Sequence, residues 1–247
     1  MNLPVGIPLY VVIEEESRDV LISAEDVLGF FDESPEVTFL GIHEMREGKR
    51  RTDDAVLEVR DHLGRVIGEY FIGRAVLGGV DALTPEGRPS SVSYHSFGNR
   101  CEYREAAEIW RRWAAVAELP KGEWVQQSAS FQEAWLHVVQ NSWFTVGRRA
   151  ARYGPDEVVN LDGAQILTPS GFYCALGEAV NGPGGYFGSN LDALADCMSS
   201  SCGNGPLAEI VWSDFETSRR SLSDGFVASL MDLLREFRVA VSVRRLS

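Results

Sequence analysis

The chain has 247 residues, of which 45% are hydrophobic and 24% are charged, and its formal net charge at pH 7 is -13. This composition is ordinary for a globular protein, and the length is enough for two modest domains with separate cores. The negative charge argues against direct binding to nucleic acid or to an anionic membrane, because both need a cationic protein surface. A basic protein partner fits the charge better.

The start of the chain, MNLPVGIPLYVVIEEESR, has no positively charged region before its short apolar stretch. We expect neither a signal peptide nor a membrane anchor, and the predicted location is the cytoplasm. The four cysteines are therefore expected to be free thiols. Cys197 and Cys202 lie close together, but only His137 follows Cys101 in the sequence. Too few ligands remain for a zinc site, and no metal or cofactor is predicted.

The first hundred residues are rich in predicted strands. Runs dense in β-branched and aromatic residues indicate them: LYVVIEE, VTFLGIHE, AVLEVRD and VIGEYFIGRAVL. The stretch from Asp61 to Gly64 predicts a hairpin turn between the last two, because glycine readily takes a positive φ. Between the first two, SAEDVLGFFDE is predicted to form a short helix that Ser23 begins.

From Tyr103 onward, apolar residues recur at helical spacing. The first predicted helix carries a stripe that runs from Ala106 to Ala117 and ends before LPKG. A second helix is predicted to start at Ser130, because Ser130 and Glu133 have the spacing of a capping box. Four tryptophans in or beside these helices are predicted to be core residues: Trp110, Trp113, Trp135 and Trp143.

A basic, irregular stretch, GRRAARYGP, indicates a linker, so domains are predicted at residues 1–150 and 153–247. After Arg152 the next basic side chain is Arg219. The acidic residues between them are Asp156, Glu157, Asp162, Glu178, Asp192, Asp196, Glu209, Asp214 and Glu216. The surface of this half is therefore predicted to be negative.

The last ninety residues alternate strand and helix patterns. Strands are predicted at EVVNL, LAEIVW and VAVSV, and helices at FYCALGEAV, SNLDALADCM, SDFETSRRS and DGFVASLMDLLREF. Strands that are separated by helical crossovers imply a parallel sheet covered by helices. The predicted fold class is α/β, with a three-stranded parallel sheet and helices on its faces, preceded by an α+β N-terminal domain.

Two aspartates, Asp192 and Asp196, stand one helical turn apart in GYFGSNLDALADCM. If Ser189 or Asn190 caps the helix, its apolar stripe faces the core and the aspartates share another face. Carboxylates at this spacing repel each other by roughly 0.2 to 0.5 kcal/mol. There are two interpretations. In one, the helix dipole stabilises the charge of Asp192, and a solvated Asp196 costs the helix little stability. In the other, the compensating cation comes from another molecule.

The same stretch resembles the signature of the barstar family, intracellular protein inhibitors of the secreted ribonuclease barnase. The residues that match are Tyr186-Phe187-Gly188-x-Asn190-Leu191-Asp192-Ala193-Leu194-x-Asp196. The similarity continues in VVNLDGAQI, PLAEIVWSDFETS and LLREF, and it covers about residues 156–247. Nothing comparable covers residues 1–150. The resemblance implies a barstar-like inhibitor, and not an enzyme, that plugs a basic ribonuclease or related toxin with its acidic helix and the preceding loop.

The resemblance also implies a set of partner-binding residues. Asp196 matches the family's principal acidic contact and Asp192 the second. Tyr186 matches an aromatic contact, Gly188 a close-approach glycine and Glu236 a further acid from the last helix. A carboxylate can accept paired hydrogen bonds from a guanidinium, as a phosphate does. The full predicted set is Tyr186, Phe187, Gly188, Asn190, Asp192, Ala195, Asp196, Ser199 and Glu236.

This chain departs from the family pattern at two of these positions. Ala195 stands where the family has a large tryptophan, which removes an aromatic contact and leaves a shallower surface. Phe187 replaces a tyrosine and lacks its hydroxyl. The target therefore need not be barnase itself and could be a basic toxin of a different shape.

Other interpretations remain. The glycines of NGPGGYFG precede a helix, as in a phosphate-binding loop, but they follow a helix instead of a strand and no Lys-Ser/Thr completes the motif. His43, His62, His95 and Cys101 could serve a cysteine hydrolase, although no activating spacing is visible. The alternative function is an N-terminal enzyme or ligand-binding domain that carries the barstar-like domain as a regulatory, protein-binding module.

Overall fold

The computed structural model describes residues 7–32, 34, 36–81, 89–200 and 202–244. The chain divides into two compact units, Met1–Ala117 and Glu118–Ser247, and each is described by itself. The basic stretch that was predicted to be a linker lies inside the second unit. Within the described residues, every helix is too short or too polar to cross a membrane.

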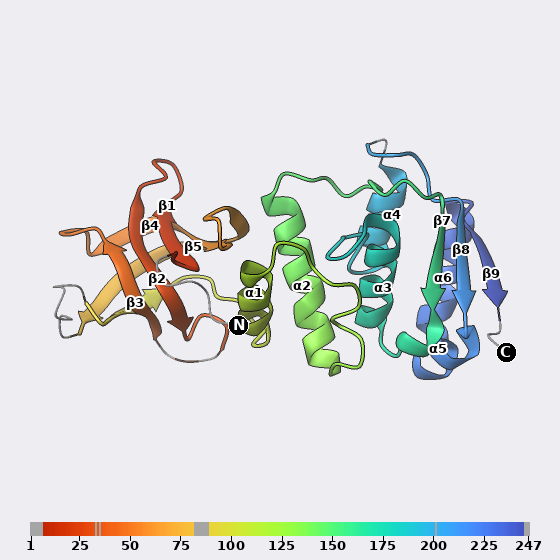
Figure 1. Cartoon of the computed structure of the whole chain (residues 1–247), viewed down its shortest axis with the longest axis horizontal. Coiled ribbons are helices and arrows are strands. Elements are labelled where there is room, and N and C mark those ends of the chain that lie inside the picture. Colours follow the sequence, from red (N-terminus) through yellow and green to blue (C-terminus); the bar gives the residue numbers. More distant parts are fainter. Residues whose placement is uncertain (1–6, 33, 35, 82–88, 201, 245–247) are drawn as a thin grey trace. The chain divides into compact units, whose positions relative to one another are not determined.

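The first unit is a closed antiparallel barrel with the strand order β1-β2-β3-β6-β5-β4 (Figure 1). Its strands are β1 (Tyr10–Glu14), β2 (Val20–Leu28), β3 (Val37–Met45), β4 (Arg51–Arg60), β5 (Val66–Val80) and β6 (Ser91–Phe97). The predicted strands are confirmed. The hairpin is confirmed too, because Gly64 has a φ of 76° and its N–H donates to the carbonyl of Asp61 at 2.9 Å.

The helix predicted at SAEDVLGFFDE is wrong, because most of this stretch belongs to β2 and to the turn after it. Ala24 pairs with Tyr10 of β1 on one side and with Ile42 of β3 on the other. A strand in the middle of a sheet satisfies its backbone groups on both edges, and this outweighs a weak local preference for helix.

Aromatic side chains fill the first unit's core. Phe30 meets Tyr70 edge to face, with ring centroids 5.2 Å apart. Helix α1 (Ala106–Ala115) adds Trp110, whose indole N–H donates to the Tyr70 hydroxyl at 2.8 Å. Val116 is extended and ends this helix, so Ala117 of the predicted stripe lies beyond it. A small barrel filled by side chains in this way is a packed core.

The second unit contains a parallel sheet in the order β7-β8-β9. Its elements are α2 (Ala129–Thr145), β7 (Val158–Asp162), the short 3-10 helix η1 (Gly163–Gln165), α3 (Pro169–Asn181), α4 (Leu191–Ser199), β8 (Glu209–Ser213), α5 (Phe215–Ser221), α6 (Asp224–Glu236) and β9 (Ala240–Arg244). The predicted α/β class and the three-stranded sheet are confirmed.

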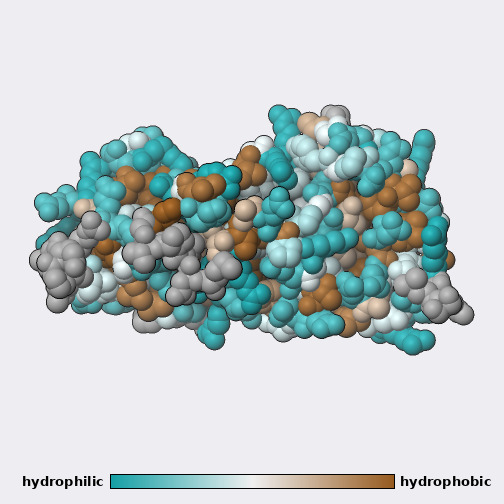
Figure 2. Space-filling model, in the orientation of Figure 1, coloured by the Kyte–Doolittle hydropathy of each residue, from teal (hydrophilic) through white to brown (hydrophobic). Residues whose placement is uncertain are grey.

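Helices cover one face of this sheet. Phe172 of α3 stacks on Trp212 of β8 with ring centroids 5.4 Å apart, and the Trp212 indole donates to Ser218 of α5 at 3.0 Å. In Figure 2, apolar surface gathers over β7 and β8 among hydrophilic surroundings. Exposed Val158 and buried Val211 belong to these strands.

Helix α2 begins two residues earlier than predicted. The Ser128 hydroxyl accepts from the N–H of Phe131 at 3.2 Å, so Ser128 is the cap and the prediction of Ser130 is wrong. The four predicted core tryptophans are buried: Trp110, Trp113, Trp135 and Trp143. Gln132 connects α2 with α3, because its side-chain oxygen accepts from the Thr168 hydroxyl that caps α3.

The basic stretch after α2 is packed through Arg152. The guanidinium of this buried residue donates to the carbonyls of Gly154, Asp156 and Gly205, each at 2.9 Å, and to that of Asn204. These carbonyls belong to the segments that lead into β7 and β8. Arg152 therefore holds the entrances to two neighbouring strands together.

Candidate functional site

The site is built on α4 and on the loop that precedes it. Asn190 caps the helix, because its side-chain oxygen accepts from the N–H of Ala193 at 2.8 Å. Asp192 lies in the first turn, where the helix dipole stabilises a carboxylate. Leu194 lies on the buried side of the helix, whereas Asp192 and Asp196 are exposed. We call the surface formed by these two aspartates the acidic face.

Neither aspartate of the acidic face forms an ion pair in the part of the chain that the structure describes. The ion pairs found there involve other residues, and in the second unit they join Arg219 to Glu216 and Arg235 to Asp232. The sequence from 153 to 218 contains no lysine, arginine or histidine. Both carboxylates are thus free to accept hydrogen bonds from another molecule.

Burial disfavours the ionised forms of a cysteine of α4 and a tyrosine of α3. Burial raises the pKa of the Cys197 thiol to about 12, and the charge of Asp196 contributes to this shift. Burial also raises the pKa of the Tyr173 hydroxyl well above its ordinary value, with a smaller contribution from Asp192.

The two aromatic residues of the predicted contact set lie inside the unit. Tyr186 and Phe187 are only 2% and 1% exposed. The Tyr186 ring packs against Phe144 of α2 with centroids 5.4 Å apart, and its hydroxyl lies 3.5 Å from that of Ser189. Both aromatics are therefore core residues of this unit, and Tyr186 reaches toward the start of α4. The burial of Tyr186 escaped sequence analysis, because Phe144 lies 42 residues away along the chain.

Gly188 also serves the fold of the site. Its φ of 97° favours glycine, and a Cβ at this position would come within 2.8 Å of the Leu194 backbone. The close approach that the resemblance implied is therefore made, within this chain, to α4. It lets the loop turn tightly under the helix that carries the acidic face.

The remaining predicted residues lie on or near α4. Ala195 is half-buried, and the exposed Ser199 donates its hydroxyl to the Ala195 carbonyl at 2.6 Å. Glu236 is the exposed last residue of α6, a helix that contacts α4. In Figure 1 this end of α6 and helix α4 lie at the same end of the sheet.

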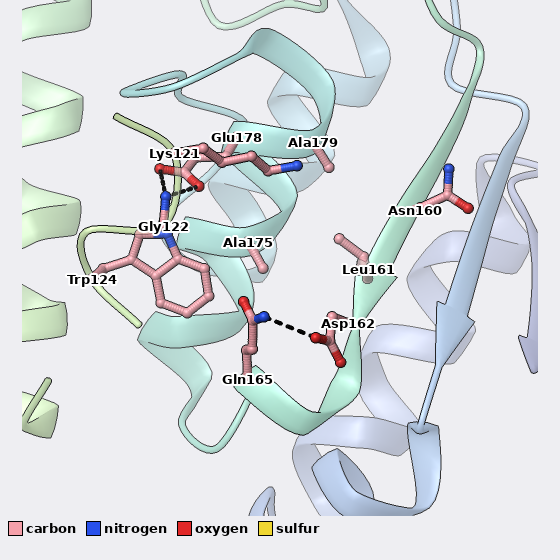
Figure 3. A pocket seen from close by; sticks show the side chains of 10 residues that line it. All are labelled: Lys121, Gly122, Trp124, Asn160, Leu161, Asp162, Gln165, Ala175, Glu178 and Ala179. Atoms are coloured by element: carbon pink, nitrogen blue, oxygen red, sulfur yellow. Dashed lines mark hydrogen bonds between the residues drawn. The ribbon is translucent and has the colours of Figure 1, made fainter. Parts of the chain in front are cut away.

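A second feature of the unit is a cavity of about 300 Å³ between α3, β7 and the segment around Gly122 (Figure 3). The buried Glu178 side chain accepts from the N–H of Gly122 with both oxygens, at 3.0 and 3.2 Å. Burial raises the pKa of this carboxyl. Gly122 lies 56 residues from Glu178, so no local pattern could have predicted the pair.

The N-terminal residues considered for a cysteine hydrolase show no activating arrangement. His43 lies 3.3 Å from a glutamate and His62 lies 3.2 Å from a backbone carbonyl, while His95 is exposed on β6. Burial raises the pKa of Cys101, which opposes formation of the thiolate that a nucleophile needs. No group of three or more metal-ligating side chains gathers among the described residues.

Among known families, the model described as barstar (barnase inhibitor) matches residues 157–246. The match covers the sheet from β7 to β9 together with α3 to α6, and it confirms the resemblance seen in the sequence. The C-terminal region is thus similar to a family whose description is that of an inhibitor. No family model matches the N-terminal region. The comparison with curated proteins found no match for the chain.

Proposed function

We propose that this protein is an immunity protein or antitoxin that acts in the cytoplasm, where it blocks the active site of a basic bacterial ribonuclease with α4. The observation that carries the proposal is the acidic face itself: Asp192 and Asp196 are exposed and form no ion pair within the described residues. A ribonuclease cleft binds RNA phosphates with arginine and lysine. Carboxylates at helical spacing can take the places of such phosphates.

The charge of the whole chain supports the same proposal. A net charge of -13 attracts a cationic partner over a distance and raises the rate of association, most strongly at low salt. The complex is expected to contain one inhibitor per ribonuclease and to show no turnover. Direct binding of nucleic acid or membrane is not part of this proposal.

The first prediction concerns Asp196. Changing Asp196→Asn is expected to weaken the complex by at least about 2 kcal/mol, roughly thirtyfold in Kd, because an interface charge loses its partner. The control is Asp224→Asn, which removes an exposed charge from the start of α6, at the opposite end of the sheet in Figure 1. Titration calorimetry with a panel of basic ribonucleases, including the product of any adjacent toxin gene, measures both variants.

Two results would contradict the proposal. One is the absence of any complex between the unaltered protein and the whole panel at low salt. The other is equal affinity for Asp196→Asn and the control, with circular dichroism showing that both remain folded.

A second candidate function follows from the barrel, which no family model explains. In that case the barstar-like region is a regulatory module that binds a protein and controls an enzyme or ligand-binding domain. Turnover of a substrate by the N-terminal unit would favour it, whereas stoichiometric inhibition of a ribonuclease favours the first proposal.

A further inference from the structure

An exposed aromatic side chain packs against the loop that leads into α4, and it comes from outside the region that matches the family. Phe144 is in the last turn of α2, and 43% of its surface is exposed. Its ring meets that of Tyr186 at an interplanar angle of 63°. Single exposed apolar residues are common, so this exposure alone indicates nothing. The position of Phe144 is what matters.

Tyr186 connects Phe144 with the acidic face. On one side, its buried ring packs against Phe144. Its hydroxyl approaches Ser189, just before α4. Ser189 immediately precedes Asn190, which caps the helix that carries Asp196. Phe144 and the start of α4 are therefore neighbours of one buried tyrosine.

The chain after Phe144 continues along the same border. Val146 is 53% exposed, and the Arg148 guanidinium lies over the Trp143 ring at 4.4 Å. Arg149 then reaches Cys202, in the loop after α4, with 3.3 Å between guanidinium nitrogen and sulfur. This segment thus lies beside the loops on both sides of α4.

Helix α4 itself offers little apolar surface between its acids. The residue there is Ala195, which is half-buried and has no side chain beyond Cβ. Charge pairs contribute most to affinity when surrounding apolar contacts exclude water from them. An aromatic ring that packs against the loop before α4 can supply such a contact.

We propose that Phe144, flanked by Val146, extends the docking surface and sets its specificity, by contacting an apolar patch beside the cationic cleft of the ribonuclease. The inference rests on the proposed function and on the continuity of Phe144 with the acidic face. It assigns part of the recognition to α2, which precedes the family-matched residues 157–246.

The test compares Phe144→Ala with Leu167→Ala in the full chain. Leu167 has a similar exposure, 49%, but it precedes α3, whereas the loop with Tyr186 follows α3. This helix of 13 residues is roughly 20 Å long. With the ribonuclease of the Asp196 experiment, Phe144→Ala is expected to raise Kd at least tenfold, mainly through faster dissociation. Leu167→Ala should stay within twofold.

Two further measurements separate docking from folding and from charge. Phe144→Leu keeps an apolar cover over Tyr186 but removes the ring, and it is expected to fold normally and to bind less tightly. The dependence of Kd on salt should be unchanged in Phe144→Ala and reduced in Asp196→Asn.

The outcomes are distinct. If Asp196→Asn lowers the affinity but both Phe144 variants leave it unchanged, this inference is overturned and the inhibitor function still stands. The absence of any complex with the unaltered protein overturns both. A loss in Phe144→Ala equal to that in Leu167→Ala also overturns the inference, because exposure alone would explain it.

Discussion

Two buried charged residues in the second unit are held by backbone groups. Glu178 accepts from the N–H of Gly122, and Arg152 donates to four carbonyls. Neither forms a salt bridge in the part of the chain that the structure describes. Each one holds chain segments that lie outside the helices and strands. Charges with this structural role are easily mistaken for functional ones in a sequence.

A prediction at this scale concerns the pH dependence of stability. Burial raises the pKa of Glu178 above 4.5, so the folded state favours the protonated carboxyl. Its contribution to the free energy of unfolding is therefore fully present at low pH and is lost as the pH rises through the folded-state pKa. The glutamine of Glu178→Gln cannot ionise. The free energy of unfolding of this variant, relative to that of the unaltered protein, should therefore increase as the pH rises from 4.5 to 7.

Urea unfolding at several pH values measures this difference. The exposed Glu157 offers a control, because Glu157→Gln removes a carboxylate that is already solvated. The free energy of unfolding could instead change with pH in the same way in Glu178→Gln and in the unaltered protein. That result would show that burial of this carboxyl has no energetic consequence.

At the scale of single elements, α4 combines features that oppose and favour a helix. Its two aspartates repel each other, while the Asn190 cap and the dipole at Asp192 favour helix formation. The positive φ of Gly188 turns the chain sharply before the helix begins. The acidic face is thus presented by a short helix whose start is well defined.

The cap supplies the prediction for this element. Asn190→Ala removes the acceptor for the Ala193 N–H and should lower the free energy of unfolding by about 1 kcal/mol. Asn190→Ser is the matched control, because serine caps nearly as well and should lose much less. Chemical denaturation compares them, and equal losses in the two variants would mean that the hydrogen bond is not the cause.

At the scale of the whole molecule, the family match and the second compact unit have different limits. The match begins at residue 157, whereas the unit begins at Glu118. The residues between include α2, whose Gln132 joins the cap of α3 and whose Phe144 covers Tyr186. They also include Arg152. The acidic face therefore rests on support from outside the matched region.

Fragments test this dependence. Residues 118–247 are expected to fold alone, and residues 153–247 should be less stable by at least about 3 kcal/mol. The shorter fragment leaves carbonyls without the Arg152 donor and exposes Tyr186 to water. Thermal unfolding of both fragments gives the comparison. Equal stability would instead support the domain limit of 153–247 that the sequence suggests.

Most of the local structure and the chemistry of the acidic face can be read from short stretches of the sequence. Runs of β-branched and aromatic residues located β1, β3, β4 and β5 of the barrel, and local patterns located the strands and helices of the second unit. Strands β2 and β6 of the barrel were not predicted. The spacing of Asp192 and Asp196 placed two carboxylates on one face, and the residues around them carry the resemblance that the family model finds in residues 157–246. These features depend on neighbours within a few positions, so they can be recognised without the fold.

The burial of a residue by distant segments of the chain became visible in the tertiary structure. Ser23 was assigned to a helix, yet it lies in a strand because β1 and β3 pair with β2 on both edges. Tyr186 carries the family's motif, yet a ring 42 residues earlier in the chain buries it. Burial is the sum of contacts between distant segments, and a local pattern holds no information about which distant segment will arrive.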